Sequence, residues 1–268
     1  MYKNYLFDLY GTLLEIETNE ETDYVWEKMA LYYGYCGSYY EPFELKDKYE
    51  KSVKKMVNDY GEGADIDIQD VFYKLFRDSE IKPKKKVPKE AAKMFRILTT
   101  EKLALYEGVI DMLMALKNQK KNLYIVANAQ SAFALLELKN CSIRKYFDDF
   151  YFSSDLHIKK PDITFYEKVF QEERLNKKES IIISADYDND IVLAQQMGVD
   201  ALFIDTSEKT ELKENIDEEA SAKDKEVKSD KIKKQVKTIM AIKDEETKAK
   251  LYTVKGYDFR KIIDNIVK

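Results

Sequence analysis

The segment YLFDLYGTLLE, residues 5–15, runs from a short apolar stretch directly into an aspartate. Tyr, Leu and Phe at positions 5–7 are typical of a buried strand, and Asp8 ends that strand. Gly11 then permits a tight turn, because glycine adopts backbone conformations that other residues avoid. Ligands of open parallel sheets bind beyond the carboxyl ends of the strands. Asp8 is therefore the first candidate for a functional side chain.

The chain after residue 108 alternates between helix-like and strand-like segments. Apolar residues three or four apart predict helices at 109–119, 132–140, 163–173 and 190–198, and apolar runs predict strands at 122–128, 149–155, 180–186 and 201–205. This alternation predicts an α/β fold with a three-layer Rossmann-like core, in which helices cover both faces of a parallel sheet. A short strand and an amphipathic helix are expected after residue 250.

Two other parts of the chain follow different patterns. Residues 16–100 contain helical stretches such as ELKDKYEKSVKKMVNDY at 44–60, which predict a separate helical unit. In residues 207–250, 12 basic and 12 acidic residues occupy 24 of 44 positions, too polar a composition to form a core. We expect this segment to be a mobile or helical insertion without a catalytic role, and a partner-binding arm is the alternative.

Composition narrows the possible functions. Lys and Arg number 45 against 50 Asp and Glu, and this net charge of −5 gives no sign of nucleic-acid binding. The apolar runs are too short to cross a bilayer, and no signal peptide is recognised at the start. Cys36 and Cys141 lack metal-site spacing and are expected to be free thiols in a reducing compartment. We therefore expect a cytoplasmic protein that binds neither nucleic acid nor membranes.

Polar side chains follow four of the predicted strands, and parallel strands would bring them to one edge of the sheet. They are Asp8, Asn128, Lys160, Asp186 and Asp190. Carboxylates are ligands that hard divalent cations prefer, and a lysine would balance the charge of an anionic substrate. An aspartate at a strand end is also able to act as a nucleophile. The sequence therefore predicts an active site at this edge.

Four motifs in this order resemble the haloacid dehalogenase superfamily of hydrolases. The motifs are FDLYGTL (7–13), IVANA (125–129), KKPD (159–162) and SADYDNDI (184–191), and LYEGVIDMLMALK (105–117) resembles the helix entry before the second motif. The resemblance implies an α/β core and an inserted α-helical cap domain between the first and second motifs. The implied division is a core of residues 1–15, 101–206 and 251–268, a helical cap of residues 16–100, and the charged insertion 207–250.

The resemblance also implies roles for the acidic residues. Asp8 would be the catalytic nucleophile that forms an aspartyl ester. Magnesium would be held by the side chains of Asp8 and Asp186 and by the backbone carbonyl of Tyr10. Asp190 would be a further acidic residue of the metal site, either as a ligand or next to one.

Further roles follow for the residues around the nucleophile. Lys160 would neutralise the charge of the nucleophile and of the transferred group. Gly11 would permit the turn, and Thr12 would brace the loop. The residues beside the phosphoryl group of the substrate would be Gly11, Thr12, Ala127 and Asn128. The implied substrate is a small phosphorylated metabolite.

Two positions depart from the pattern of the family's phosphatases. Tyr10 stands where these enzymes usually carry an aspartate that acts as general acid and base. A phenol with a pKa of about 10 is a poor base at neutral pH, although it is able to donate a proton. Ala127 stands where a serine or threonine usually contacts the phosphoryl oxygen, and the loss of such a contact slows turnover on the order of 10²-fold or more. A slow reaction is therefore expected.

Three functions stay open from the sequence. The favoured one is a magnesium-dependent phosphatase that works through an aspartyl-phosphate intermediate. A non-catalytic binding protein of the same family is the alternative, because Tyr10 and Ala127 both weaken the expected chemistry. A 2-haloacid dehalogenase is less favoured, although Tyr10 resembles that branch. The related dehalogenases carry a cap arginine some thirty residues after the nucleophile, and here the first arginine is Arg77.

Overall fold

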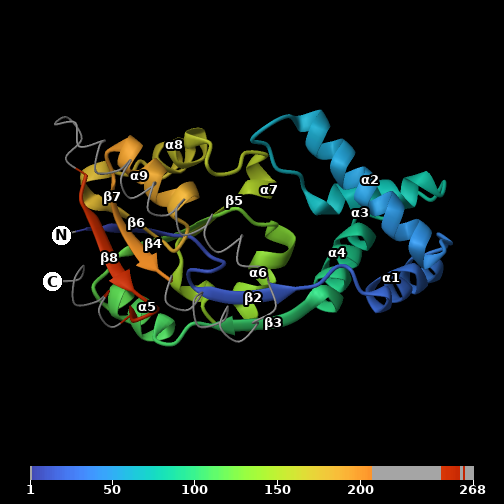
Figure 1. The fold of residues 1–268 in the computed structure, drawn as a ribbon, viewed down its shortest axis with the longest axis horizontal. Coiled ribbons are helices and arrows are strands. Elements are labelled where there is room, and N and C mark those ends of the chain that lie inside the picture. The colour runs from blue at the N-terminus through green and yellow to red at the C-terminus, as the bar shows by residue number, and fades with distance from the viewer. Residues whose placement is uncertain (1, 207–248, 260–261, 263–268) are drawn as a thin grey trace, which may run out of the picture.

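The computed structural model describes residues 2–206, 249–259 and 262, and its centre is a parallel sheet (Figure 1). The six strands lie in the order β5-β4-β1-β6-β7-β8, and every neighbouring pair is parallel. Their bounds are β1 Asn4–Phe7, β4 Asn122–Ala127, β5 Asp149–Phe152, β6 Ser180–Ser184, β7 Asp200–Asp205 and β8 Leu251–Lys255. The predicted α/β class with a Rossmann-like core is confirmed.

Helices cover both faces of this sheet. The longer ones are α5 (Val109–Asn118), α6 (Ser131–Asn140), α8 (Ile163–Glu172) and α9 (Val192–Met197), and the short α7 spans Ser153–Leu156. Side chains alternate along a strand, so Phe7 of β1 joins the hydrophobic cluster under α5, whereas Leu6 joins the cluster under α8 and α9. The sheet therefore separates two cores and forms the middle of three layers.

A second unit, which we call the cap, contains four helices and lies beside the core in Figure 1. The helices are α1 (Asp23–Tyr35), α2 (Pro42–Tyr60), α3 (Ile68–Asp78) and α4 (Lys86–Thr99). They bury a hydrophobic cluster of their own, in which the aromatic rings of Trp26, Phe72 and Phe95 pack together. Ala132 and Phe133 of α6 belong to the same cluster, so α6 is the part of the core on which the cap docks.

Two antiparallel strands connect the cap to the core. They are β2 (Leu14–Thr18) and β3 (Thr100–Leu105), and in the described part of the chain they form a two-stranded sheet separate from the six-stranded one. The sequence did not predict these strands, because TEKLAL in β3 lacks the alternation of a half-buried strand. The chain passes between core and cap twice, once in β2 and once in β3. The hydrogen bonds between these two strands form a ribbon, and this ribbon fixes where the cap is attached.

The loop between α2 and α3 makes a further contact between cap and core. The carboxylate of Asp65 accepts a hydrogen bond from Ser153 Oγ at 2.5 Å, and Lys159 N donates to Gly63 O at 3.0 Å. The ring of Tyr60 stacks on His157, with centroids 4.7 Å apart. The cap is thus held to the core at α6, at the start of α7 and at the loop around Lys159.

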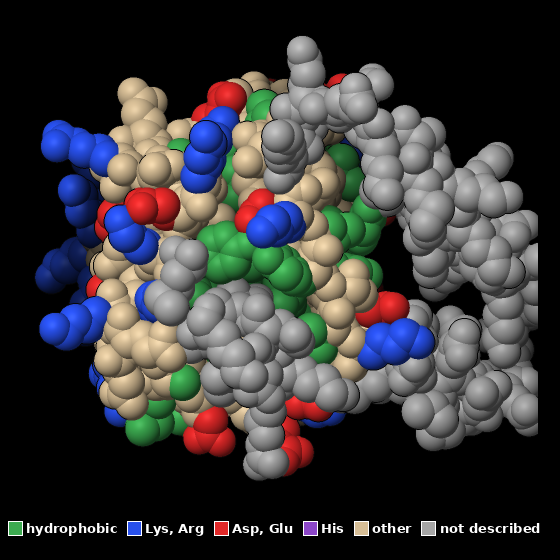
Figure 2. All heavy atoms as spheres, turned by 90° about the vertical axis from the view of Figure 1, so that its left-hand side faces the viewer, with side chains coloured by type: hydrophobic (Ala, Val, Ile, Leu, Met, Phe, Trp, Pro, Cys, Tyr) green, Lys and Arg blue, Asp and Glu red, His purple; other side chains and the backbone are tan. Residues whose placement is uncertain are grey.

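The far end of the sheet carries β8 and faces away from the cap. Figure 2 shows this end of the molecule, where hydrophobic side chains gather in the centre and charged side chains surround them. The expected charged insertion at 207–250 lies almost wholly outside the described residues. No helix in the described part of the chain is both long enough and apolar enough to cross a membrane.

Candidate active site

Lys160 lies between two carboxylates at the carboxyl ends of the central strands. Its Nζ is 2.8 Å from Asp8 Oδ1 and 2.9 Å from Asp190 Oδ2, and it also donates to Val126 O at 3.0 Å. Asp8 is 7% exposed, Lys160 3% and Asp190 0%. Burial alone would lower the pKa of Lys160, but the two carboxylates raise it above its ordinary value. The lysine is therefore charged, and three predicted site residues meet.

Thr12 braces residues 8–13 from inside, and we call this segment the nucleophile loop because it carries the predicted nucleophile Asp8. The fully buried Thr12 donates from Oγ1 to Asp8 Oδ2 at 3.0 Å and accepts from Ala185 N at 3.0 Å. Gly11 has φ +76°, a conformation that side-chain-bearing residues rarely adopt. Its carbonyl accepts a hydrogen bond from Tyr257 at 2.9 Å. Both residues therefore shape the loop, and the orientation of the Asp8 carboxylate depends on Thr12.

Replacing Thr12 by valine is expected to destabilise the fold. Valine has the same shape but leaves the half-buried Ala185 N–H without an acceptor and removes the bond to Asp8, which together cost about 1–3 kcal/mol in the free energy of unfolding. Urea denaturation would measure the change. The matched control is Thr164→Val, which removes an exposed hydroxyl bonded to Asp162. Equal stability of the two variants would contradict the bracing role of Thr12.

Asp190 is held by three donors, two of which the sequence did not single out. Tyr166 OH donates to Asp190 Oδ1 at 2.5 Å, and Ser184 Oγ donates to Oδ2 at 2.7 Å. Lys160 is the third donor. Tyr166 lies on the buried face of α8, where its spacing resembles that of any core aromatic residue. Both oxygens of Asp190 are thus turned toward Lys160 and its neighbours.

Asp186 follows β6 and begins the π-helical turn η3 (Tyr187–Ile191). Asn189 donates to both of its oxygens, from N to Oδ1 at 3.0 Å and from Nδ2 to Oδ2 at 2.8 Å. The backbone N–H of Asp186 donates to Ser184 Oγ at 2.9 Å. These bonds fix the carboxylate at the carboxyl edge of the sheet, close to the residues around Asp190.

The carboxylates predicted to bind a metal ion do not form a cluster of three ligands. Among the described residues, no group of three or more His, Cys, Asp and Glu side chains has an arrangement suited to a metal ion. Asp190 does not add a third carboxylate, because its oxygens accept from Lys160, Tyr166 and Ser184. Magnesium commonly uses only one or two protein carboxylates, together with water and substrate oxygens. Asp8 and Asp186 would provide that smaller set, because they follow the paired strands β1 and β6 and, unlike Asp190, are not fully buried. Their oxygens also accept hydrogen bonds, from Lys160 and Thr12 at Asp8 and from Asn189 at Asp186.

The second motif, residues 125–129, supports the backbone of Lys160. The Asn128 side chain donates from Nδ2 to Lys160 O at 2.9 Å and accepts from Lys160 N at 2.8 Å. The amide group thereby holds the backbone on which the lysine is mounted. Ala127 is 1% exposed, and its methyl group belongs to the hydrophobic cluster under α5. Neither residue offers a hydroxyl to a substrate.

The side chain of Tyr10 is engaged with α6. Its hydroxyl donates to Glu137 Oε2 at 2.5 Å, and burial, followed by the charge of Glu137, raises the pKa of Tyr10 well above its ordinary value. Arg96 of α4 donates from Nε to Glu137 Oε1 at 2.6 Å. The sequence pointed to neither Arg96 nor Glu137. A glutamate in an amphipathic helix is expected to face solvent, yet Glu137 is buried.

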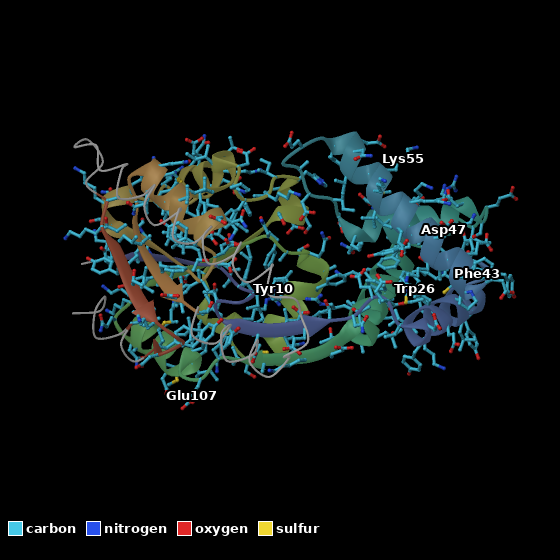
Figure 3. The ribbon with its side chains drawn as sticks, in the orientation of Figure 1. Tyr10, Trp26, Phe43, Asp47, Lys55 and Glu107 are labelled. Atoms are coloured by element: carbon cyan, nitrogen blue, oxygen red, sulfur yellow. The ribbon has the colours of Figure 1, made fainter. Side chains whose placement is uncertain are left out.

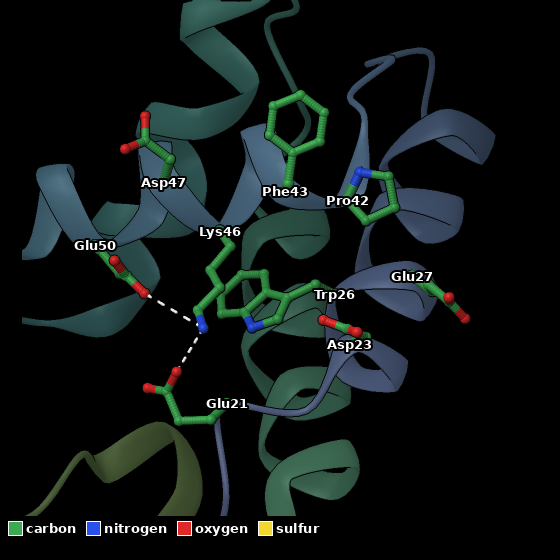
Figure 4. Close-up of a pocket in the computed structure, with 9 residues that line it drawn as sticks. All are labelled: Glu21, Asp23, Trp26, Glu27, Pro42, Phe43, Lys46, Asp47 and Glu50. Carbon is green, nitrogen blue, oxygen red and sulfur yellow. Dashed lines mark hydrogen bonds and ion pairs between the residues drawn. The ribbon is translucent and has the colours of Figure 1, made fainter.

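A groove on the cap lies apart from this cluster. Figure 3 places Trp26, Phe43 and Asp47 on the cap helices, well away from Tyr10. Figure 4 shows the ammonium group of Lys46 between Glu21 and Glu50, with which it forms ion pairs. The groove is lined by Glu21, Asp23, Trp26, Glu27, Pro42, Phe43, Lys46, Asp47 and Glu50. It contains none of the predicted site residues.

Known structures with a similar fold include both dehalogenases and a phosphatase. The L-2-haloacid dehalogenase from Xanthobacter autotrophicus aligns over 99% of this chain and 100% of its own, with a TM-score of 0.53 and 13% identity. A phosphatase from Thermococcus onnurineus aligns over 97% of both chains, with a TM-score of 0.50 and 18% identity. The 2-haloacid dehalogenase from Pseudomonas syringae covers 76% of this chain and 86% of its own, with a TM-score of 0.51 and 17% identity.

Sequence comparison identifies the family directly. No curated protein matches the chain. The family model described as haloacid dehalogenase-like hydrolase matches residues 5–204, which span both the nucleophile loop and the fourth motif. The match covers most of the chain, and the fold and the strand-end cluster agree with it. The chain therefore belongs to the haloacid dehalogenase-like hydrolases.

Proposed function

We propose that this hydrolase is a magnesium-dependent phosphatase that acts on a small phosphorylated metabolite through Asp8. The observation that carries the proposal is the charge balance at the strand ends. Asp8, Asp186 and Asp190 supply three carboxylates, and Lys160 is the cation that contacts two of them. An anionic phosphate would be repelled by this excess of negative charge. A divalent cation held by Asp8 and Asp186 would remove the repulsion.

The residues of the chain divide the chemistry between them. The Asp8 carboxylate attacks phosphorus, the bond to the leaving oxygen breaks, and an aspartyl phosphate forms; attack by water then releases phosphate and restores Asp8. Lys160 stabilises the negative charge of the transferred group, and Thr12 fixes the orientation of Asp8. Magnesium, held by Asp8, Asp186 and the carbonyl of Tyr10, would supply charge stabilisation for the phosphoryl oxygens.

Activation of water is the slow part of this scheme. The phenol of Tyr10 donates to Glu137, and its raised pKa keeps it protonated, so it is unsuited to remove a proton from water. The substrate itself or bulk water must then accept that proton. Decay of the aspartyl phosphate is expected to limit turnover.

Removal of the metal is expected to stop hydrolysis of an aryl phosphate, and added magnesium should restore it. Asp186→Asn is expected to raise the magnesium concentration needed for half-maximal rate by about 10-fold or more, because a carboxylate ligand becomes a neutral amide. The exposed Asp188, two residues further on, provides the control variant Asp188→Asn, which should keep the wild-type requirement. Full activity in the presence of a chelator would refute the metal-dependent proposal.

A second candidate is a 2-haloacid dehalogenase, and the position of Arg96 favours it. The guanidinium carbon of this cap residue lies 5.5 Å from the centroid of the Tyr10 ring, although the sequence has no arginine in residues 30–50. Glu137 already pairs with this arginine, which weakens its attraction for a substrate anion. Release of halide from a 2-haloacid without metal would favour this candidate. Magnesium binding with no turnover of either substrate class would favour a non-catalytic binding protein.

A further inference from the structure

Glu137 is a buried carboxylate that joins the cap to the nucleophile loop. It lies on α6 and is 5% exposed. Its Oε1 accepts from Arg96 Nε at 2.6 Å, and its Oε2 accepts from Tyr10 OH at 2.5 Å. Arg96 comes from the last cap helix, whereas Tyr10 comes two residues after Asp8. One carboxylate therefore connects a cap side chain with the loop that carries the proposed nucleophile.

Arg96 is enclosed by groups of the core. Besides its bond to Glu137, its guanidinium carbon lies 5.0 Å from the ring centroid of Phe133 and 5.5 Å from that of Tyr10. Both distances are within the range of attractive cation–π contacts. The side chain of Arg96 is only 17% exposed. Its position on α4 thus depends on how closely the cap lies against α6.

Movement of the cap would break this arrangement at one defined point. If α4 left α6, Glu137 would stay in the core as a buried carboxylate without its cation, which is unfavourable. Glu20, in the linker between β2 and α1, also faces Arg96. Glu20 is exposed, partial desolvation raises its pKa, and the charge of Arg96 opposes this rise. The arginine therefore lies at the base of the cap, where the linkers meet.

The side chain of Tyr10 connects Glu137 with the backbone of the loop. Tyr10 forms a backbone bridge with Leu14, and Gly11 N donates to Leu14 O at 2.8 Å, so the loop is a compact turn. A side chain anchored at its far end restricts the backbone from which it comes. The carbonyl of Tyr10 and the Asp8 carboxylate lie on this same turn.

We propose that Arg96, Glu137 and Tyr10 form a closure lock, in which docking of the cap sets the geometry of the nucleophile loop. Arg96 and Glu137 act as positioning residues through Tyr10. The lock holds the loop in its working conformation when the cap is closed and loosens it when Arg96 withdraws. This inference rests on the proposed nucleophilic role of Asp8 and adds a link between cap position and turnover.

Steady-state kinetics on an aryl phosphate tests the lock. Glu137→Gln and Tyr10→Phe are each expected to lower kcat about 10-fold and to leave KM within about twofold, because the chemical step and not substrate binding is affected. The double variant should be no slower than the slower single variant, since both substitutions remove the same link. Arg96→Lys should retain more activity than Arg96→Met, because it keeps the cation.

The control removes a different contact between cap and core. Asp65→Asn weakens the bond to Ser153 but leaves the lock intact, and its kcat should stay within about twofold of the wild type. If Asp65→Asn lowers kcat as much as Glu137→Gln does, general docking of the cap explains the effect and the lock is overturned. Independent, multiplying losses in the Tyr10→Phe/Glu137→Gln double variant would also overturn it.

A measurement without substrate separates the lock from the proposed phosphatase activity. In urea unfolding, Arg96→Met and Tyr10→Phe should shift the midpoint non-additively, because both side chains act on Glu137 and also contact each other. The non-additivity should shrink when Glu137→Gln is present in all the variants, because the part that passes through Glu137 is then lost. Additive shifts would overturn the lock. If the wild type hydrolyses no phosphate ester, the proposed function fails, and this cycle still decides whether the three residues are coupled.

Discussion

Asp8→Asn is expected to abolish hydrolysis, with a fall in kcat on the order of 10⁴-fold or more. The amide has nearly the shape of the carboxylate and is still able to accept from Thr12, but it is not a nucleophile. Rate measurements with an aryl phosphate, and mass spectrometry of the acid-quenched enzyme, would test this result. A phosphoryl adduct on the peptide that contains Asp8 is expected in the wild type and not in the variant.

The control for this prediction is Asp111→Asn, which makes the same change at an exposed position in the first turn of α5. Its rate should equal that of the wild type. Circular dichroism should show that Asp8→Asn is folded, so that the lost rate reports chemistry. Substantial residual turnover in Asp8→Asn would mean that Asp8 is not the nucleophile, and the proposed mechanism would have to be abandoned.

The largest effect on stability is expected from Lys160→Met. This change removes the cation between two buried carboxylates and leaves Asp8 and Asp190 without a partner charge. Breaking a buried ion pair on one side costs about 3–5 kcal/mol in the free energy of unfolding. Adding Asp190→Asn to the same chain should recover part of the loss, because one of the uncompensated charges is then gone. Denaturant unfolding of both variants would measure the difference.

An exposed ion pair provides the comparison for this experiment. Lys102 of β3 pairs with Glu15 of β2, and both side chains are partly open to solvent. Lys102→Met should therefore change the free energy of unfolding by no more than about 1 kcal/mol. A similar loss in Lys102→Met and Lys160→Met would show that burial of the ion pairs of Lys160 does not increase the loss of stability. Activity should be absent in Lys160→Met even when Asp190→Asn restores stability.

The sequence was sufficient to predict which site residues meet when their position follows from the order of the parallel strands alone. Asp8, Asn128 and Lys160 come at or after the ends of parallel strands, and those ends share one edge whatever the packing of the helices. Their meeting could therefore be predicted from strand order and polar residues. The elements from which they come agree with the predicted strands within a few residues.

Residues on helices could not be recognised in the same way. Glu137 and Tyr166 are buried because of how α6 and α8 pack, and the helical pattern shows only which face is apolar. Arg96 is 86 positions from Tyr10 in the chain, and their contact depends on the docking of the cap. Strands β2 and β3 were missed for a related reason, since each is stabilised mainly by the other and carries little pattern of its own.

Strand β8 has a consequence for the behaviour of the protein at high concentration. It covers β7, whose Leu202 and Ile204 are fully buried, and without it the backbone N–H and C=O groups along β7 would be open to another chain. Open strand edges promote aggregation between molecules, and short edge strands with lysines counteract it. β8 is five residues long, follows Lys250 and ends at Lys255. This last strand thus protects the sheet from intermolecular pairing.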